Sequence, residues 1–337
     1  MPSPGRCPSL VIGSGGEPQF DQHVRIPAIS PPVDPHGLPA ALPPELALGR
    51  MPDNVVGRGS RACALLTFRS AGRPPPESIV TSMQSLPVSE IVRRYDAGVR
   101  ARPVAPPGLR VENLDGVVTL VGFYNFVSSW SFAAERAAET VAKMAQRFRE
   151  RGESLMWHVY EHDGPLELGA DLVANGFVAD QTATLMVTSV EAACRDLALP
   201  TADEIRQVGT IDALRDSIAA GGLAFGAEDD WQMAAFKDRL TDPDLALYVA
   251  YHEGQPVGSG RLEAHCHSGF GELFGGGVAP DFRGRGLYRG MVAARAHRAR
   301  ELGLEFLVTS ARETSRPILE KLGFQSAGLK TCWILKA

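Results

Sequence analysis

The segment whose residue types and spacing most clearly suit a binding or catalytic function is 278–290, which has the sequence VAPDFRGRGLYRG. Gly284 and Gly286 alternate there with Arg283 and Arg285, between a predicted strand and a predicted helix. The first backbone N–H groups of a helix have no internal partner, and the helix dipole is positive at that end, so such a turn suits a phosphate. Glycine lets the ligand approach the backbone, and arginine matches phosphate oxygens. The stretch therefore predicts a phosphate or diphosphate site.

Two other phosphate-binding motifs do not fit this stretch. A dinucleotide-binding GxGxxG motif that starts at Gly284 needs glycine at position 289, where Arg289 stands. A P-loop needs GxxxxGK followed by serine or threonine, and the sequence contains no such run. The turn also comes late in the chain, whereas a dinucleotide-binding turn normally follows a first strand. An adenine-nucleotide site on the same turn stays open as an alternative.

The elements around this turn alternate between strand and helix patterns, which predicts an α/β architecture with a mixed sheet. The predicted order is a strand and helices over 203–240, two strands over 244–265 joined at Glu253-Gly254, a glycine-rich strand over 268–280, a helix over 290–303, a strand over 304–312, a helix over 314–324 and a strand over 325–337.

An earlier part of the chain has a similar order. Regular structure is predicted from about residue 86, with two strands over 109–122 around a turn at Asp115-Gly116, a helix over 131–152, a strand over 153–163, a short helix over 164–177 and a strand over 178–191. Both short helices end in Gly-Phe, in LVANGF at 172–177 and LEKLGF at 319–324. We therefore expect two related units.

Residues 1–82 differ in composition from the rest, because they hold 15 of the 25 prolines and show no periodicity. Proline removes backbone donors and interrupts regular structure. Two interpretations stay open: a disordered arm, or an over-extended start with translation beginning near Met83.

Composition limits the classes of function. The 337 residues carry a net charge of −5, which gives no general signature of polyanion binding, so we expect no nucleic-acid partner. No apolar run is long enough to cross a membrane, and the N-terminus does not have the pattern of a signal peptide, so a cytoplasmic location is expected. The cysteines are odd in number and lack metal-ligand spacing, which predicts free thiols in a reducing compartment. They are Cys7, Cys63, Cys194, Cys266 and Cys332.

The C-terminal unit, roughly residues 200–337, resembles the GCN5-related N-acetyltransferase (GNAT) family. The signature of that family is Arg or Gln, two residues, Gly, one residue, then Gly or Ala. Arg283 and Gly286 fill the first two fixed positions, and Tyr288 departs from the third. The preceding context also matches at Val278, Pro280 and Phe282. A degenerate copy before an active one is similar to a set of bacterial tandem GNAT proteins. The resemblance implies two GNAT-like units with mixed, mostly antiparallel sheets flanked by helices.

The resemblance implies that acetyl-CoA binds as a co-substrate, without a metal. The diphosphate would lie on the backbone N–H groups of the turn, and the pantetheine arm would lie along the end of the preceding strand. The implied cofactor-binding residues are Gly276, Gly277, Val278, Arg283, Gly284, Arg285, Gly286, Leu287 and Tyr288. For the three glycines at 275–277 a simple bulge stays open. Arginines further along the helix are expected on a solvated face, with contact to the 3′-phosphate as the alternative; they are Arg295, Arg298 and Arg300.

Acyl transfer to an amine needs a proton acceptor and a route for the proton to the thiolate. Glu272 is our candidate base, because it lies six residues before Val278 and alternation would place both on one face. An exposed strand glutamate is the alternative. Leu319 stands where many family members have a tyrosine acid, which leaves Tyr288, water or no acid at all. His265 and His267 flank Cys266, but no third metal ligand is evident, so a loop pair is expected.

The predicted organisation is an arm over 1–82, a degenerate unit over 83–195 and a catalytic unit over 196–337. The first unit has no counterpart of RGRG, so it is expected not to bind CoA and to form a wall of the acceptor cleft or a structural partner. A second chain in a homodimer is the alternative source of that wall. The predicted function is N-acetylation of an unidentified small-molecule or peptide amine. A non-catalytic acyl-CoA-binding or regulatory module is the alternative.

Overall fold

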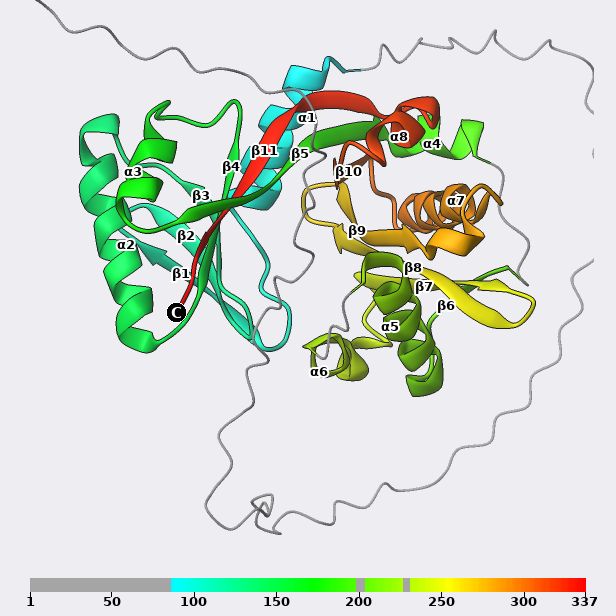
Figure 1. The fold of residues 1–337 in the computed structure, drawn as a ribbon. Helices are drawn as coiled ribbons and strands as arrows, with labels where there is room; N and C mark the ends of the chain where they lie inside the picture. Colours follow the sequence, from blue (N-terminus) through cyan, green and yellow to red (C-terminus); the bar gives the residue numbers. More distant parts are fainter. Residues whose placement is uncertain (1–85, 198–203, 227–230) are drawn as a thin grey trace, which may run out of the picture. The chain divides into compact units, whose positions relative to one another are not determined.

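One continuous sheet runs through the described part of the chain. The computed structural model describes residues 86–197, 204–226 and 231–337, so the predicted arm over 1–82 lies outside the described residues. The sheet has 11 strands in the order β1-β2-β3-β4-β11-β5-β10-β9-β8-β7-β6 (Figure 1). The strands are β1 (Leu109–Leu114), β2 (Val117–Gly122), β3 (Phe126–Trp130), β4 (Leu155–Tyr160), β5 (Val178–Ser189), β6 (Ile205–Gln207), β7 (Leu245–His252), β8 (Gln255–His265), β9 (Phe270–Val278), β10 (Phe306–Ala311) and β11 (Gln325–Leu335).

Helices flank this sheet. They are α1 (Val88–Tyr95), the π-helical turn η1 (Asp96–Arg100), α2 (Ala137–Arg151), α3 (Leu168–Ala174), α4 (Val190–Asp196), α5 (Ile211–Phe225), α6 (Trp231–Phe236), α7 (Leu287–Glu301) and α8 (Arg316–Lys321), with 3₁₀ turns at Ala134–Arg136, Lys237–Arg239 and Pro280–Phe282. In the described ranges, none of the helices combines the length and apolar character that a membrane crossing needs.

The sheet is mixed and mostly antiparallel, as expected. Among the described strands, β3–β4 and β9–β10 pair in parallel, and all other neighbours are antiparallel. The sequence predicted a sheet in each half, and the structure joins them. The last strand of the first half, β5, pairs with β10, while the last strand of the chain, β11, pairs with β4 and β5. Each half thus completes the sheet of the other. The predicted division at residues 195 and 196 stays a prediction.

Two hairpins were predicted correctly from their turn residues. Asp115 and Gly116 join β1 to β2 with φ of 51° and 81°, and Glu253 and Gly254 join β7 to β8 with φ of 51° and 79°. Positive φ at both central residues is the geometry of a type I′ turn, which matches the twist of the flanking strands. The conformation of each turn is therefore determined by its own two central residues, an acidic residue followed by glycine.

Strands β8 and β9 carry a helix on each face (Figure 1). On one face, a side chain added at Gly260 would come within 3.1 Å of Arg295 in α7. On the other face, a side chain added at Gly277 would come within 2.6 Å of Phe225 in α5. Both faces are therefore packed closely, and glycine is required where a helix approaches the strand.

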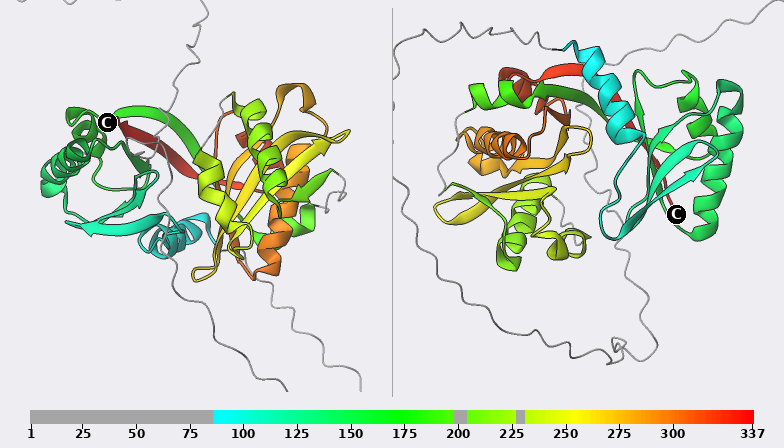
Figure 2. Two further views of the ribbon diagram at one scale, coloured as in Figure 1. Left: turned by 90° about the horizontal axis from the view of Figure 1, so that it is seen from below. Right: turned by 180° about the vertical axis from the view of Figure 1, so that it is seen from behind.

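Four elements were not predicted from the sequence, namely α1, η1, β3 and α4. α1 crosses the sheet where the strands of the two halves meet (Figure 2). Its Tyr95 packs edge-on against Phe270 of β9, with 5.6 Å between the ring centroids. β3 contains Ser128 and Ser129 at its centre, which interrupt the apolar pattern of a strand. Helix α7 also begins at Leu287, three residues before the predicted start at 290.

The packing of η1 against the turn between β8 and β9 can be tested at Gly98. An added Cβ there would lie 2.7 Å from the Cβ of Ser268, which is closer than two such atoms approach. Alanine favours a helical turn over glycine by ~1 kcal/mol, but the clash reverses the sign. We expect Gly98→Ala to lower the thermal unfolding midpoint.

The same substitution at Gly209, where no atom lies within 4 Å of the added Cβ, is the control and should leave the midpoint nearly unchanged. Adding Ser268→Gly to Gly98→Ala should recover stability, which a double-mutant cycle measures. A Gly98→Ala variant as stable as the parent would contradict this packing.

Candidate active site

The parallel pair β9–β10 separates before β9 ends. The pairing runs from Phe270 opposite Phe306 to Leu273 opposite Thr309, and the Thr309 hydroxyl donates to the Leu273 carbonyl at 2.8 Å. β9 continues to Val278 with β8 as its only strand neighbour within the described residues. The outer backbone edge of β9 from position 274 onward is therefore available to another extended chain.

A bulge lies in the part of β9 that pairs with β8 but not with β10. Ser259 pairs with Gly277 and Arg261 with Phe274, so two residues of β9 oppose one of β8. Gly275 has φ of 56°, which favours glycine. Of the two interpretations of the glycine run, the structure therefore contains the bulge. A close approach by the pantetheine arm stays a prediction.

The bulge corrects one sequence argument about Glu272. Alternation predicted that Glu272 and Val278 share a face, but an extra residue in a strand reverses the side on which later side chains point. Val278 packs in the apolar cluster under α7, whereas Glu272 contacts α1 on the opposite face. The two residues therefore lie on opposite faces of the sheet.

The turn after β9 presents unpaired backbone donors. Gly284 and Gly286 have φ of 77° and 84°, and Gly286 is the N-cap of α7. The first hydrogen bond into the helix is from the Gly290 N–H to the Gly286 carbonyl at 2.9 Å. Within the described part of the chain, no acceptor takes up the N–H groups of residues 284–288. A Cβ at Gly284 or Gly286 would meet no atom within 4 Å, so the space in front of these donors is open.

The side chains of the turn have different roles from its backbone. Arg283 Nε donates to the Val278 carbonyl at 3.1 Å, which ties the turn to the end of β9. Arg285 is exposed, with its guanidinium 6.0 Å from the Phe282 ring centre. Leu287 is buried in the core under α7, so only its N–H can face a ligand.

Tyr288 and Leu319 bear on the route of the proton. The Tyr288 ring lies against β9, 3.3 Å from the position of a Cβ at Gly276, and burial raises its pKa. A phenol above its usual pKa of about 10 is a weaker acid than a thiol, whose pKa is about 8.5. Leu319 is buried in the core. Neither position therefore offers a good acid for a thiolate.

One sequence expectation on α7 is wrong. Arg295 was expected on a solvated helix face, but its side chain is buried, with 1% of its surface exposed. Arg298 forms an ion pair with Glu301 at 3.1 Å, and Arg300 is exposed. The charge of an arginine favours a solvated helix face, but Arg295 points back into the sheet, where backbone carbonyl groups accept its hydrogen bonds.

Glu272 is held by two donors from different parts of the chain. Its Oε1 accepts from the Tyr95 hydroxyl at 2.6 Å, and its Oε2 lies 2.8 Å from His265 Nε2. Its side chain is 18% exposed, so the alternative of an exposed strand glutamate is wrong. No local pattern identifies Tyr95 as a partner, because 177 positions of sequence separate it from Glu272.

The contact between Glu272 and His265 favours the charged form of both groups. Burial opposes ionisation of Glu272, but the hydrogen bond and charge of His265 outweigh it and leave the Glu272 pKa lowered. Burial likewise opposes the charged ring of His265, and the hydrogen bond and charge of Glu272 outweigh it and raise the His265 pKa. His265 is therefore a strand-end partner of Glu272 rather than a loop residue. His267 Nε2 lies 2.9 Å from the Gly98 carbonyl.

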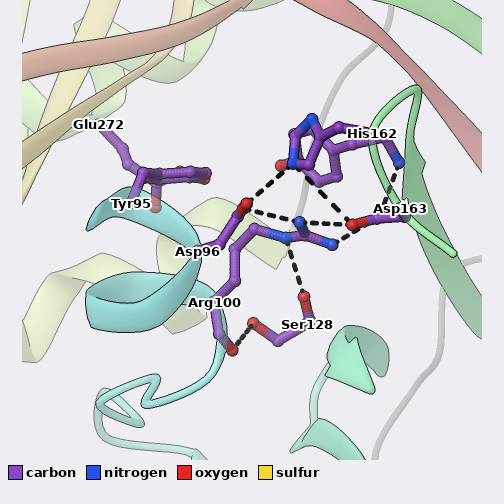
Figure 3. Close-up of polar contacts among 8 residues, drawn as sticks. Tyr95, Asp96, Arg100, Ser128, His162, Asp163 and Glu272 are labelled. Atoms are coloured by element: carbon purple, nitrogen blue, oxygen red, sulfur yellow. Dashed lines mark hydrogen bonds and ion pairs between the residues drawn. The ribbon is translucent and has the colours of Figure 1, made fainter. Parts of the chain in front are cut away.

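A second charged cluster lies beside Tyr95, where η1 meets the end of β4 (Figure 3). The buried Arg100 guanidinium donates to Asp96 at 2.7 Å and to both carboxylate oxygens of Asp163 at 2.9 and 2.7 Å. Its Nε donates to the Ser128 carbonyl at 3.2 Å, and His162 Nε2 lies 2.9 Å from Asp96. This network fixes η1 to β3 and β4. Nowhere in the described ranges do three or more His, Cys, Asp or Glu side chains gather as metal ligands.

An aromatic contact brings the first half of the chain to the edge of the second. The loop between β2 and β3 places Phe123 and Tyr124 against Trp231 at the start of α6, with ring centroids 6.3 and 6.1 Å apart. Burial raises the pKa of Tyr124 to about 12, with the charge of Glu263 as a further cause. This loop therefore reaches the face of β8 and β9 that carries Glu263 and Glu272.

Comparisons with known proteins agree with the resemblance in the sequence. Residues 212–324 match the model of the acetyltransferase (GNAT) family. The fold is similar to a GCN5-related N-acetyltransferase from Kribbella flavida, with a TM-score of 0.54 and 18% identity over 73% of this chain and 94% of that one. It is also similar to a functionally unknown conserved protein from Staphylococcus epidermidis ATCC 12228, with a TM-score of 0.50 and 14% identity over 68% of this chain and 94% of that one.

A comparison with curated proteins gives no match. At these identities the solved structures establish the fold, which is a mixed α/β GNAT-like fold, and the family model supports the GNAT family for residues 212–324.

The charged pair predicts a pH dependence of stability. A histidine whose pKa rises on folding stabilises the protein below its unfolded pKa of about 6.5 and loses this contribution as the pH rises through the folded pKa. Both His265 and His162 have raised pKa values. We expect the thermal unfolding midpoint to fall as the pH rises above about 6.5, and to fall less in His265→Gln.

Glu272→Gln is the matched variant, since it removes the charge that raises the His265 pKa. It should reduce the pH dependence in the same way as His265→Gln, and the double variant should add little. A parental pH profile in both single variants would contradict the charged pair.

Proposed function

We propose that this protein is an acetyl-CoA-dependent N-acetyltransferase that transfers the acetyl group to an amine of a small molecule or peptide. One observation carries this proposal: the unpaired N–H groups of residues 284–288 stand at the start of α7, directly after the unpaired edge of β9. The first feature suits a diphosphate, and the second suits an extended arm that needs backbone partners. Their adjacency matches a long ligand with a diphosphate at one end.

The residues present fit acetyl-CoA as a co-substrate. The open space in front of Gly284 and Gly286 would receive the diphosphate, and the glycines keep Cβ atoms out of it. Arg285 would add positive charge from the solvent side. The β9 edge at Gly276, Gly277 and Val278 would bind the pantetheine arm through the backbone. The bulge would turn the unpaired backbone groups of β9 toward that arm.

Glu272 is the proposed base. It lies on β9 next to the end of the pairing with β10, and it is ionised at neutral pH. The amine must lose a proton to attack, because an unperturbed amine has a pKa of about 10. Glu272 would accept this proton directly or through one water, although its lowered pKa makes it a modest base. Tyr95 and His265 would hold the carboxylate in place.

We propose that residues 83–195 form a degenerate GNAT-like unit that does not bind CoA. β3 pairs in parallel with β4 only as far as Val127 opposite Trp157, and β3 also contains an irregularity opposite β2, as β9 does opposite β8. At this point, however, Arg100 Nε donates to the Ser128 carbonyl, and the Ser128 hydroxyl donates to the Arg100 carbonyl at 2.8 Å. Arg100 would thus occupy the position on β3 that corresponds to the proposed binding site of the arm on β9.

The first half would also contribute a wall to the acceptor site. Phe123 and Tyr124 reach Trp231 and lie on the side of the sheet that carries Glu272. An amine acceptor between these aromatic rings and Glu272 would approach the end of the arm from the face opposite α7. A wall supplied by a second chain in a homodimer is the competing arrangement.

The buried Leu319 favours a second candidate function, a non-catalytic acyl-CoA-binding or regulatory module. The family's usual tyrosine acid is missing at this position, and Tyr288 is a poor replacement because its pKa is raised. In this function the chain would bind acyl-CoA as described but would not release free thiol.

The binding turn can be tested with two matched glycines at the ends of α7. Gly286 and Gly303 both have positive φ, of 84° and 71°, and at both an added Cβ meets no atom within 4 Å. Alanine at either should cost a similar ~1–2 kcal/mol of stability. Only Gly286→Ala should weaken CoA binding, by about tenfold or more, or ~1.4 kcal/mol.

Calorimetric titration with CoA measures this difference, and we expect one CoA per chain in the parent. Gly303→Ala is the control and should bind CoA with the parental affinity. Equal affinities in both variants would refute the placement of the diphosphate.

Turnover separates the two candidate functions. Release of free thiol from acetyl-CoA in the presence of an amine panel should occur in the parent, and Glu272→Gln should lower kcat by ~10²-fold or more while the affinity for CoA changes little. Glu305→Gln is the control, because Glu305 pairs with Arg94 at the surface. Tight CoA binding without thiol release for every amine would support the binding module.

A further inference from the structure

We propose that Arg295 is a positioning residue of the transfer site: it holds the β9 bulge and places a buried positive charge beside the acyl arm, where this charge stabilises the departing thiolate. The inference rests on the proposed function, because it assumes that the arm lies along β9. Arg295 lies in α7, outside the turn proposed to bind the diphosphate.

The guanidinium links the two strands at the bulge. Arg295 Nε donates to the Met291 carbonyl at 2.9 Å, one turn back in α7. Its Nη1 lies 3.4 Å from the Arg261 carbonyl of β8 and 3.5 Å from the Phe274 carbonyl of β9, and these two residues are paired with each other at one end of the bulge. The side chain therefore fixes the bulge to α7 at the point where the ladder is interrupted.

Two glycines make room for this side chain. A Cβ at Gly260 would lie 3.1 Å from Arg295 Cζ, and a Cβ at Gly276 would lie 3.2 Å from Arg295 Nη2. These distances are shorter than ordinary van der Waals contacts, so an added Cβ at either position would shift the guanidinium by a few tenths of an ångström, and a larger side chain would displace it further. Gly276 is also one of the residues proposed to hold the arm. The charge thus lies directly beneath the proposed path of the arm.

The charge of Arg295 has no anionic partner in the part of the chain that the structure describes. No carboxylate there forms an ion pair with it, and its hydrogen bonds go to neutral carbonyl groups. Burying a charge without a counter-charge is costly, and arginine does not escape the cost by losing its proton. Such a residue is retained most readily where an anion offsets the cost during function.

The reaction supplies an anion at this place. The nitrogen lone pair of the amine forms a bond to the thioester carbonyl carbon, the carbon–sulfur bond breaks, and its electron pair goes to sulfur. The proton of the amine goes to Glu272 or to water. Because Tyr288 is a weak acid and Leu319 has no proton to give, sulfur leaves as a thiolate. A fixed cation in a dry environment stabilises such a charge without reorganisation.

The experiment measures the pKa of the CoA thiol in the complex, from the ultraviolet absorbance of the thiolate as a function of pH. The complex with desulfo-CoA is the blank, because it removes the contribution of the protein's own cysteines. In the parent we expect a thiol pKa below the usual value of about 8.5. Arg295→Met should raise it by about one unit or more, and Arg295→Lys should retain most of the shift.

Gly260→Val is the second variant, since its larger side chain displaces the guanidinium without removing its charge. It should raise the thiol pKa in the same direction, which keeps the inference testable if Arg295→Met does not fold. In turnover, Arg295→Met should lower kcat more than it changes KM for acetyl-CoA, and Arg295→Lys should recover much of kcat.

The outcomes are distinct. A parent that binds no CoA overturns the proposed function and this inference with it. A parent that binds CoA with an unshifted thiol pKa overturns the inference alone. An unchanged thiol pKa in both Arg295→Met and Gly260→Val does the same, because it means that Arg295 serves only to hold the bulge.

Discussion

The exchange of final strands between the two halves is the interaction on which the rest of the structure depends. β5 pairs with β10 and β11 pairs with β4, so the backbone ladders that close each half are made by the other. α1 packs on the sheet where these strands meet, which brings Tyr95 to Glu272. The separation of β9 from β10, and hence the unpaired edge proposed for the acyl arm, lies next to this junction.

At the end of each of the two parallel strand pairs lies a buried arginine, but the electrostatic surroundings of the two arginines are opposite. Where β3 leaves β4, the buried Arg100 is neutralised by Asp96 and Asp163 and bonded to the strand. Where β9 leaves β10, the buried Arg295 has no carboxylate partner in the described ranges, and glycines keep the strand accessible. A satisfied ion network rigidifies the first place. An unbalanced charge suits the second place for a ligand that develops negative charge.

Local signals in the sequence predicted the parts of the fold that local physics decides. The hairpin turns at Asp115-Gly116 and Glu253-Gly254, the helix end at Gly152 and the turn at Gly284 and Gly286 all have the backbone angles expected from their residues. Three other features depend on contacts between segments that are distant in sequence, which local patterns do not predict. They are the strand exchange, the position of α1 on the sheet and the Tyr95–Glu272 hydrogen bond. The bulge in β9 also reversed the predicted face of Val278, because one extra residue shifts every later side chain.

The shared sheet has a consequence for how the chain reaches this structure during synthesis. Leu155 of β4 pairs with Leu335 of β11, so the ribosome must synthesise the chain as far as Leu335 before the first half can close. Until then β4 and β5 present open edges, which are sites of aggregation and of misplaced pairing between nascent chains. Contacts this far apart in sequence also slow folding, since a long loop must close before they form. We therefore expect the two halves to fold together, because β4 and β5 lack their pairing partners until β10 and β11 have been synthesised.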